Sequence, residues 1–351
     1  MEANMGATQD RFCIDRLQSG GLITNYSCTS RCRHCLYCCS PYRSKAYIDR
    51  STALENFETI RELGCATVHI GGGEPFLDPE RLEEVLDAAA DARMKIDYIE
   101  TNSSWYKDRE SATALLKRFK RKGLSTLLVS ISPFHNEHIP FSKVKGVIGA
   151  CRDAMVSIFP WIADFYADVN GFEERLPHGP SEYLAKYGED YFKNIPERYW
   201  VHFGGRALTS FRHYYPAHDA DCVAASNGGC AELLNTSHFH LDLFGNCIPG
   251  LCSGLAIRRE DLGEPLSPEK YPLLTLLYRS GVKGLLDHAR SEHGFEPAGE
   301  YISKCHLCTE IRAHLVLHKG VVSNELQPSE LYKEYAAFSD SLPAPPGPEA
   351  A

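Results

Sequence analysis

The sequence lacks three features that would assign it to common classes of protein. No uncharged apolar run approaches the roughly 20 residues that a membrane-spanning helix needs. Residues 1–20 are acidic and polar, without the apolar segment of a secretion signal. Basic residues are in the minority, because 37 Lys and Arg against 46 Asp and Glu give a net charge of -9. These absences predict a cytoplasmic protein that binds neither a membrane nor nucleic acid.

Cysteine, by contrast, is abundant, with 14 in 351 residues. Most of the cysteines stand in short clusters, at 28–39, 247–252 and 305–308, rather than in the spread pattern of a disulfide framework. In a protein that is not secreted, clustered cysteines are typical metal ligands.

The first cluster has the spacing C-x3-C-x2-C through Cys28, Cys32 and Cys35. Three thiolates at this spacing can face one metal centre, whereas a 4Fe-4S cluster has four irons. One iron is then left without a protein ligand. An iron of this kind is available to bind and reduce a substrate, which distinguishes the arrangement from an electron carrier closed by four thiolates.

The hydrophobic pattern predicts an α/β fold. Strand-like and helix-like segments alternate from residue 22 onward, and the sixth and last strand of the series is expected at 199–203. The first helix opens near Ser51, which is its expected N-cap. Parallel strands with right-handed crossovers curve toward a barrel, and six units are two short of a closed one. We therefore expect a partial (β/α)6 TIM-type barrel over residues 21–210, after an N-terminal extension at 1–20.

The composition changes after residue 210 and becomes rich in Cys, Gly and His. We expect a small cysteine-rich domain at 211–335 and a disordered, Pro- and Ala-rich tail at 336–351. A strand-turn-strand runs from His240 to Cys252, with Gly245 at the turn. His238 and His240 alternate along the first of these strands and share a face, which permits metal binding but is also typical of a hydrogen-bonded sheet surface.

Unusual residues follow several of the predicted strands. In parallel α/β sheets the ligand site lies at the carboxyl ends of the strands, so we expect these residues to meet on one rim. In chain order they are the three cysteines after the first strand, Gly72-Gly73-Glu74-Pro75 after the second, Asn102 after the third, Ser130 and Ser132 at the end of the fourth, and Gly205-Arg206 after the sixth.

With these motifs in place, the chain resembles the radical S-adenosylmethionine (SAM) enzymes over about residues 21–210. The resemblance rests on C-x3-C-x2-C after a first strand and Gly-Gly-Glu-Pro after a second, with His34 at a position where the family usually has an aromatic residue or histidine. It implies that the three cysteines hold three irons of a 4Fe-4S cluster and that the fourth iron binds the amino and carboxylate groups of SAM. Reduction of the sulfonium then yields methionine and a 5′-deoxyadenosyl radical, which abstracts hydrogen from a substrate.

The expected SAM-binding residues come from the same segments. Glycines let the backbone at Gly72 and Gly73 come close to a ligand and present carbonyls to the SAM ammonium group. Serine and asparagine side chains suit the ribose hydroxyls, and an arginine suits the methionine carboxylate. The predicted cofactor-binding residues are His34, Gly72, Gly73, Glu74, Pro75, Asn102, Ser130, Ser132 and Arg206.

The C-terminal cysteines resemble the shortened auxiliary-cluster domains, called SPASM or twitch, that many radical SAM enzymes carry. The resemblance implies a second 4Fe-4S cluster with four cysteine ligands, namely Cys230, Cys252, Cys305 and Cys308. The sequence departs from the pattern, because six residues rather than four separate Gly245 from Cys252. Cys222 and Cys247 are the substitutes should one ligand be wrong. Four thiolates also suit a tetrahedral zinc ion, and unligated cysteines are a third alternative.

The expected function is that of a radical SAM enzyme of the oxidoreductase or maturase type. It would abstract hydrogen from a peptide or small molecule and oxidise or cross-link it with help from the auxiliary cluster and an external reductant such as flavodoxin or ferredoxin. His135, Glu137 and His202 are candidate catalytic residues, each with a structural role as the alternative. About 20 residues precede the first strand, so we expect no N-terminal peptide-recognition domain of the kind that peptide maturases often carry. The rival functions are a radical SAM methyl- or group-transferase and a non-enzymatic iron-sulfur or zinc protein.

Overall fold

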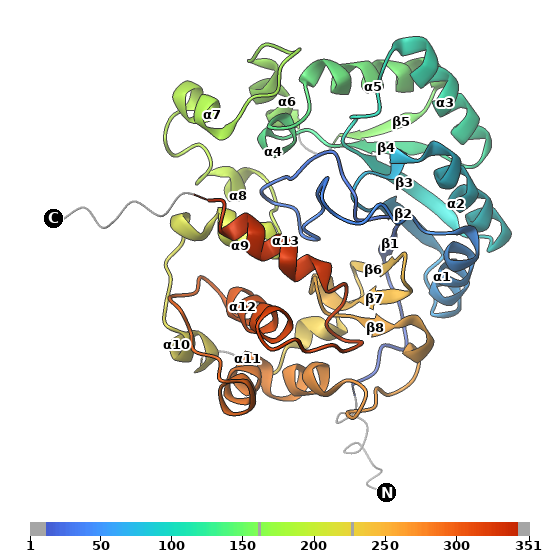
Figure 1. Ribbon diagram of the computed structural model, residues 1–351. Helices are drawn as coiled ribbons and strands as arrows, with labels where there is room; N and C mark the ends of the chain where they lie inside the picture. The colour runs from blue at the N-terminus through green and yellow to red at the C-terminus, as the bar shows by residue number, and fades with distance from the viewer. Residues whose placement is uncertain (1–11, 161–162, 226–227, 343–351) are drawn as a thin grey trace, which may run out of the picture.

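A computed structural model describes residues 12–160, 163–225 and 228–342 of the chain. Within them, eight strands form one sheet with the order β5-β4-β3-β2-β1-β6-β7-β8 (Figure 1). The strands are β1 Gly20–Ile23, β2 Thr67–Gly71, β3 Lys95–Thr101, β4 Thr126–Val129, β5 Ser157–Pro160, β6 Phe239–Asp242, β7 Asn246–Ile248 and β8 Ile257–Arg258. The fold class is confirmed: the fold is mixed α/β with a mostly parallel sheet, consistent with a partial TIM-type barrel, and is followed by a cysteine-rich region.

The helices fall into two groups along the chain, one before β6 and one after β8. The helices before β6 are α1 Arg50–Glu62, α2 Pro79–Asp91, α3 Arg109–Arg121, α4 Pro133–Asn136, α5 Phe141–Ala154, α6 Ala163–Asn170, α7 Pro180–Tyr187, α8 Ile195–Arg198, α9 Arg206–Ser210 and α10 Ala220–Ala225. Those after β8 are α11 Pro272–His293, α12 Lys304–Leu317 and α13 Glu330–Ser339. None of these described helices has the length and apolarity needed to cross a membrane.

The crossover helices begin where aspartate side chains cap them. Asp49 accepts a hydrogen bond from the Thr52 amide at 2.8 Å, and Asp78 and Asp108 cap α2 and α3 in the same way. The prediction of Ser51 as the first N-cap is wrong. Ser51 lies two residues after Asp49, inside the helix, and donates its hydroxyl to the Asp49 carboxylate, which is the group that accepts the Thr52 amide. Together with α5, these helices cover the outer face of the strands (Figure 1).

The predicted sixth strand at 199–203 is not a strand. Trp200 is 62% exposed, and the Gly204 amide turns back to the His202 carbonyl at 2.9 Å. Strand propensity alone does not make a strand, because the backbone also needs a hydrogen-bonding partner. On this side the sheet ends at β5, whose described ladder runs only to β4. The sixth parallel strand is β6 instead, on the opposite side of the sheet.

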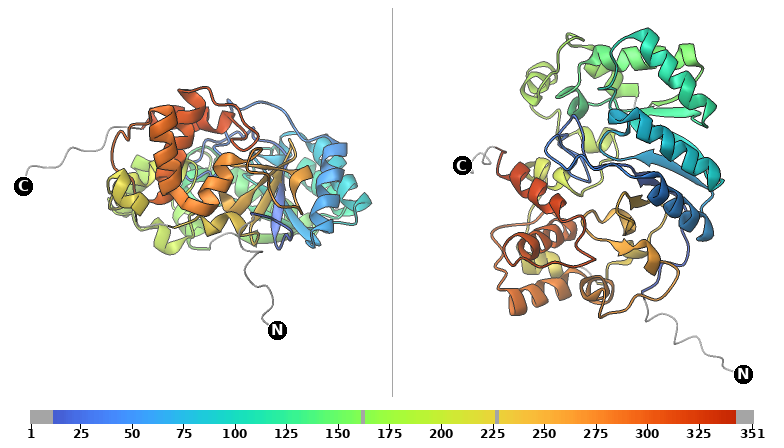
Figure 2. Two further views of the ribbon diagram at one scale, coloured as in Figure 1. Left: turned by 90° about the horizontal axis from the view of Figure 1, so that it is seen from below. Right: turned by 45° about the vertical axis from the view of Figure 1, so that its right-hand side comes forward.

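The C-terminal region shares the sheet with the N-terminal half. β6 pairs with β1 in parallel register from Gly20↔Phe239 to Ile23↔Asp242, and β7 and β8 follow as antiparallel neighbours. Helices α11 to α13 lie beside these strands and across the sheet from α1 to α3, as both views in Figure 2 show. The boundary predicted near residue 210 thus separates two segments of one sheet.

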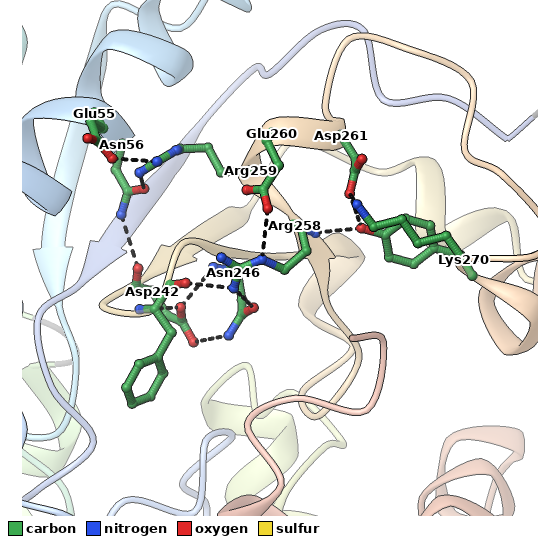
Figure 3. A network of polar contacts seen from close by, with 11 residues as sticks. Glu55, Asn56, Asp242, Asn246, Arg258, Arg259, Glu260, Asp261 and Lys270 are labelled. Atoms are coloured by element: carbon green, nitrogen blue, oxygen red, sulfur yellow. Dashed lines mark hydrogen bonds and ion pairs between the residues drawn. The ribbon is translucent and has the colours of Figure 1, made fainter. Parts of the chain in front are cut away.

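Polar contacts also join the two halves around Asp242, which is fully buried at the end of β6 (Figure 3). Tyr26 donates its hydroxyl to the Asp242 carboxylate at 2.9 Å, and the buried Asn56 of α1 donates to the Asp242 carbonyl at 3.0 Å. The Asp242 carboxylate also accepts the amides of Phe244 and Asn246, which closes the turn to β7. The turn of the β6–β7 hairpin is therefore held against α1.

Two of the predicted segments lie at the ends of the chain. The extension expected at 1–20 includes β1 residue Gly20, and its first part, 1–11, lies outside the described residues. The tail expected at 336–351 begins inside α13, whose last residue is Ser339. Its remainder, 343–351, also lies outside the described residues.

Candidate functional site

A cavity of about 400 Å³ lies at the carboxyl ends of β2, β3 and β4, under the loop that follows β1. We call residues 24–49, between β1 and α1, the cysteine loop. Of the residues predicted from sequence, those that line the cavity are Cys28, Cys32, His34, Cys35, Gly72, Gly73, Asn102, Ser130, His135 and His202. Those that do not line it are Glu74, Pro75, Ser132, Glu137 and Arg206. Most of the predicted residues thus meet at the carboxyl ends of the parallel strands, as expected from the usual position of ligand sites in such sheets.

Two of the three cysteines of the C-x3-C-x2-C motif, Cys28 and Cys35, present their sulfur atoms to hydrogen-bond donors. The Ser30 amide and the Asn102 side-chain amide each lie 3.4 Å from the Cys28 sulfur, and the Cys39 amide lies 3.4 Å from the Cys35 sulfur. Donors around a sulfur favour its ionised form, which is the form that binds a metal.

Burial acts against that ionised form. It raises the pKa of Cys28 to about 12 and that of Cys32 well above the usual value. Cys35 differs, because a hydrogen bond from the Cys39 thiol, with further donors and a nearby positive charge, lowers its pKa below the usual value. Buried thiols of this kind become thiolates when a metal supplies the positive charge. The donor set therefore fits an iron-sulfur cluster at this loop.

Arg206 supplies a fixed positive charge behind the cysteine loop. Its side chain is fully buried, and Nε and Nη2 donate to the carbonyl oxygens of Cys32 and Cys39 at 2.8 and 2.5 Å. The remaining nitrogen, Nη1, is buried without a hydrogen-bond partner. The structure thus shows Arg206 binding the loop backbone, and the expected role in binding a methionine carboxylate stays a prediction.

The segment Gly72-Gly73-Glu74-Pro75 packs against the start of the cysteine loop. A Cβ atom on Gly73 would lie 1.9 Å from the Ser27 carbonyl oxygen, and one on Gly72 would lie 2.7 Å from the Asn25 carbonyl oxygen. Glycine is therefore required here by the neighbouring backbone. The Glu74 carboxylate points inward and accepts from the Asn102 amide at 2.7 Å and from the Phe76 amide at 3.0 Å. Glu74 supports the turn, and Pro75 begins the short helix after it.

The polar residues after β3 and β4 divide between the cavity and the surrounding structure. Asn102 uses its side-chain amide to bind the cysteine loop, at 3.1 Å from the Thr29 hydroxyl as well as at Cys28. Ser130 lines the cavity. Ser132 instead caps α4 and its hydroxyl lies 2.7 Å from His135 Nδ1. The expected contacts of these residues with ribose hydroxyls are not tested by the geometry and stay predictions.

The candidate histidines and Glu137 have different surroundings. His34 packs against Phe134 and His135, and burial lowers its pKa to about 3. Glu137 forms a two-pronged ion pair with Arg33 at 3.0 and 3.1 Å and does not face the cavity. His135 and His202 both line the cavity, so they stay candidates for contact with a substrate.

A second, smaller cavity holds the four cysteines predicted for the auxiliary site. Cys230, Cys252, Cys305 and Cys308 all line it, from the turns around β6 to β8 and from the first turn of α12. The two substitutes lie elsewhere, since Cys247 is buried within β7 and Cys222 is exposed in α10.

No three of these four sulfur atoms are as close together as the ligands of a bound zinc ion. A tetrahedral zinc ion with bonds of about 2.3 Å holds its sulfur ligands about 3.8 Å apart. In the described part of the chain, no three cysteine sulfurs lie within 4.8 Å of one another. A four-iron cube binds thiolates at its separate corners and tolerates the wider spacing.

Sequence reasoning missed several residues of the larger cavity. Glu100, Tyr98, Trp200 and Tyr37 line it, and burial raises the pKa of the Glu100 carboxyl to about 7. Tyr98 and Glu100 alternate with buried Ile99 in β3, so strand periodicity was a signal for their shared face. No comparable signal existed for Trp200, because its segment was assigned to a strand.

Two residues line both cavities. His202 and Leu251 contribute to the walls of the larger cavity and of the cysteine-lined one. The two cavities thus adjoin each other at His202 and Leu251.

Comparison with known proteins assigns the first part of this site. The radical SAM superfamily model matches residues 22–157, while no curated protein matches the chain. Among solved structures, native anSMEcpe with bound AdoMet is 13% identical with a TM-score of 0.43, covering 93% of this chain and 100% of that one. Streptococcus suis SuiB bound to precursor peptide SuiA is 13% identical with a TM-score of 0.34, covering 90% and 75%. These two likenesses are too distant to carry a functional assignment. The match includes the cysteine loop and the strands that surround the cavity, so the likeness to the radical SAM superfamily covers the part of the chain that builds the first candidate site.

Proposed function

We propose that the protein is a radical SAM enzyme that cleaves SAM reductively and abstracts hydrogen from a peptide or small molecule. An auxiliary 4Fe-4S cluster in the second cavity assists oxidation or cross-linking of that substrate. The proposed setting is the cytoplasm, where a reductant of the flavodoxin or ferredoxin type supplies the electron.

The observation that carries the proposal is the convergence of three cysteines on a cavity at the strand ends of a radical SAM domain. Cys28, Cys32 and Cys35 would hold the first cluster, and the remaining cavity wall would surround SAM. When bound, the cluster and SAM supply reductive cleavage of the sulfonium and a 5′-deoxyadenosyl radical that removes a hydrogen atom from the substrate.

The chain's own residues prepare this cavity in two ways. Tyr98 and Tyr199 contribute aromatic walls, which shield a reactive intermediate from water. The Glu100 carboxyl group faces the same space with a pKa raised by burial to about 7, so its oxygen atoms can hold or release a proton near neutral pH.

The test is the formation of 5′-deoxyadenosine by the anaerobically reconstituted protein with a reductant and SAM. We expect the product in the wild type and its loss in the Cys28→Ala, Cys32→Ala, Cys35→Ala triple variant. A protein with full iron content that forms no 5′-deoxyadenosine would contradict the proposal. Recovery of S-adenosylhomocysteine instead would identify a methyl-transfer reaction.

The auxiliary cluster has a separate test in the iron content. Two clusters give about eight irons per chain, and the triple variant should retain about four. Cys252→Ser should also lose about four irons, because Cys252 lines the second cavity. Cys247→Ser is the matched control: its thiol is buried in β7, so iron content should stay near eight. Loss of all iron from the triple variant, with zinc bound to sulfur neighbours at about 2.3 Å in its place, would rule out the second cluster.

A further inference from the structure

Three histidines meet below the large cavity, although they are far apart in the sequence. His69 lies on β2, His240 on β6, and His238 immediately before β6. One ring nitrogen from each lies within 4.8 Å of the others, and among the described residues this is the one such group of metal-binding side chains. The Nε2 atoms of His69 and His240 are 3.0 Å apart.

The sheet brings these rings together through a glycine. Gly21 of β1 pairs with His69 on one side and with His240 on the other, so the three positions form a row across the sheet. A Cβ atom on Gly21 would lie 2.4 Å from His69 Nε2. Because Gly21 has no side chain, the imidazole rings of His69 and His240 have room to approach each other.

The rings of His69 and His240 each have a further partner besides the other ring. His240 Nδ1 lies 2.7 Å from the Tyr37 hydroxyl, and the His69 ring hydrogen-bonds to the backbone of Gly20 and stacks on Tyr98 at 5.0 Å. Metal-binding histidines have the same arrangement, because the second ring nitrogen bonds to an oriented group and fixes the ligand nitrogen.

The surroundings keep the imidazoles neutral, as metal ligands must be. Burial lowers the pKa of His69 to about 3 and that of His240 well below its usual value, and it also lowers the pKa of His238. A neutral pair at 3.0 Å shares one proton in the metal-free protein. Around a tetrahedral ion with bonds of about 2.0–2.1 Å, the two nitrogens would lie about 3.3–3.4 Å apart, which is a small displacement.

We propose that His69, His238 and His240 bind a divalent metal ion of the zinc type. His238 and His240 line the large cavity, so the ion's fourth position faces the space in which the substrate would lie. Three histidines with one open position form the donor set of catalytic zinc sites, in which a water or substrate oxygen occupies the fourth position. The proposed ligand of that position is a carboxylate or carbonyl oxygen of the substrate. The assignment of a substrate oxygen to the fourth position rests on the proposed function, whereas the metal site itself does not.

The experiment measures zinc in the reconstituted, iron-loaded protein after exposure to Zn²⁺ and removal of the excess. The wild type should retain one zinc per chain, and zinc-edge X-ray absorption should show nitrogen neighbours at about 2.0–2.1 Å. His69→Gln should lose that zinc, with iron content unchanged. His213→Gln removes an exposed histidine outside the cluster and should keep it.

His238→Gln provides a second variant if His69→Gln fails to fold, because His238 is only partly buried. It should weaken zinc binding at least tenfold against a competing chelator. Three results would overturn the proposal: no retained zinc in the wild type, equal retention in the folded His69 and His238 variants, or sulfur neighbours at about 2.3 Å, which would place the ion among the cysteines. None of these results depends on SAM cleavage, so failure of the metal site and failure of the proposed function are distinguishable.

Discussion

Arg206 brings a full positive charge into the protein interior, next to the backbone of the cysteine loop. Its fork of donors reaches two carbonyls at once, which lysine cannot reproduce. We expect Arg206→Lys to lower the free energy of unfolding by about 2–4 kcal/mol, because buried carbonyls and a poorly paired charge remain. We also expect about four irons per chain to be lost, measured by iron analysis after reconstitution.

Arg121→Gln is the control for this change, since Arg121 is exposed on α3. It should leave iron content unchanged and alter the free energy of unfolding by no more than about 0.5 kcal/mol. Full iron loading of Arg206→Lys would show that the loop holds its shape without the arginine fork.

His178 gives the protein a pH-dependent contact before α7. Burial alone would lower its pKa, but hydrogen bonds at 2.8 Å to the Glu182 carboxylate and the Glu173 carbonyl outweigh burial and raise it. A raised histidine pKa contributes stability that is present below about pH 6.5 and is lost as pH rises through the folded-state value. His178→Gln should therefore reduce stability at about pH 6 by up to about 1 kcal/mol and by less at about pH 8.5.

Urea unfolding at the two pH values measures this difference. Glu182→Gln removes the partner carboxylate and should flatten the pH dependence in the same way. A stability loss in His178→Gln that is equal at both pH values would refute the ionic contribution.

At the scale of elements, the junction between β2 and the cysteine loop depends on close backbone contact. Gly73→Ala would place a methyl group against the Ser27 carbonyl, 1.9 Å away, and push on the residue that precedes Cys28. We expect the free energy of unfolding to fall by about 1–3 kcal/mol, as for other overpacked sites. SAM binding by equilibrium dialysis should also weaken, because the loop lies over the cavity.

Gly228→Ala is the matched control, because a Cβ atom there meets nothing within 4 Å. Its urea midpoint and SAM affinity should equal those of the wild type. Unchanged values for Gly73→Ala as well would mean that the junction yields to the methyl group at little cost.

At the scale of the whole molecule, the buried amide of Asn56 joins α1 to the C-terminal hairpin (Figure 3). It donates to the Asp242 carbonyl and accepts from Arg259, both at 3.0 Å. Asn56→Ala should cost about 1–3 kcal/mol of stability, because it leaves a buried carbonyl without its partner. Its neighbour Glu55 also contacts Arg259 but is exposed, so Glu55→Ala should cost about 0–1 kcal/mol.

Urea unfolding of both variants tests this contrast between neighbouring residues. If the halves unfold together, Asn56→Ala should also shift the unfolding of the C-terminal region, followed by iron release from the auxiliary site. Equal stability losses in the two variants would contradict the assignment of the buried amide as the joining contact.

The sequence by itself determined the features that depend on neighbouring residues. The spacing of Cys28, Cys32 and Cys35, the helix that begins after Asp78, and the alternation in β3 are local patterns, and local geometry turns each into a predictable shape. The rule that ligand sites lie at the ends of parallel strands then placed the large cavity correctly without any coordinates.

Only the tertiary structure decided which distant segments became partners. The segment at 199–203 has strand propensity but no strand beside it, whereas β6 found a place beside β1. The pairing of β6 with β1 placed His240 in line with Gly21 and His69. It thereby added His69 to the pair His238 and His240, whose role the sequence had left open, and formed a cluster of three ring nitrogens. Propensity belongs to single residues, but hydrogen-bonded pairing requires two backbones to meet, and the position of the second backbone is set by the packing of the entire chain.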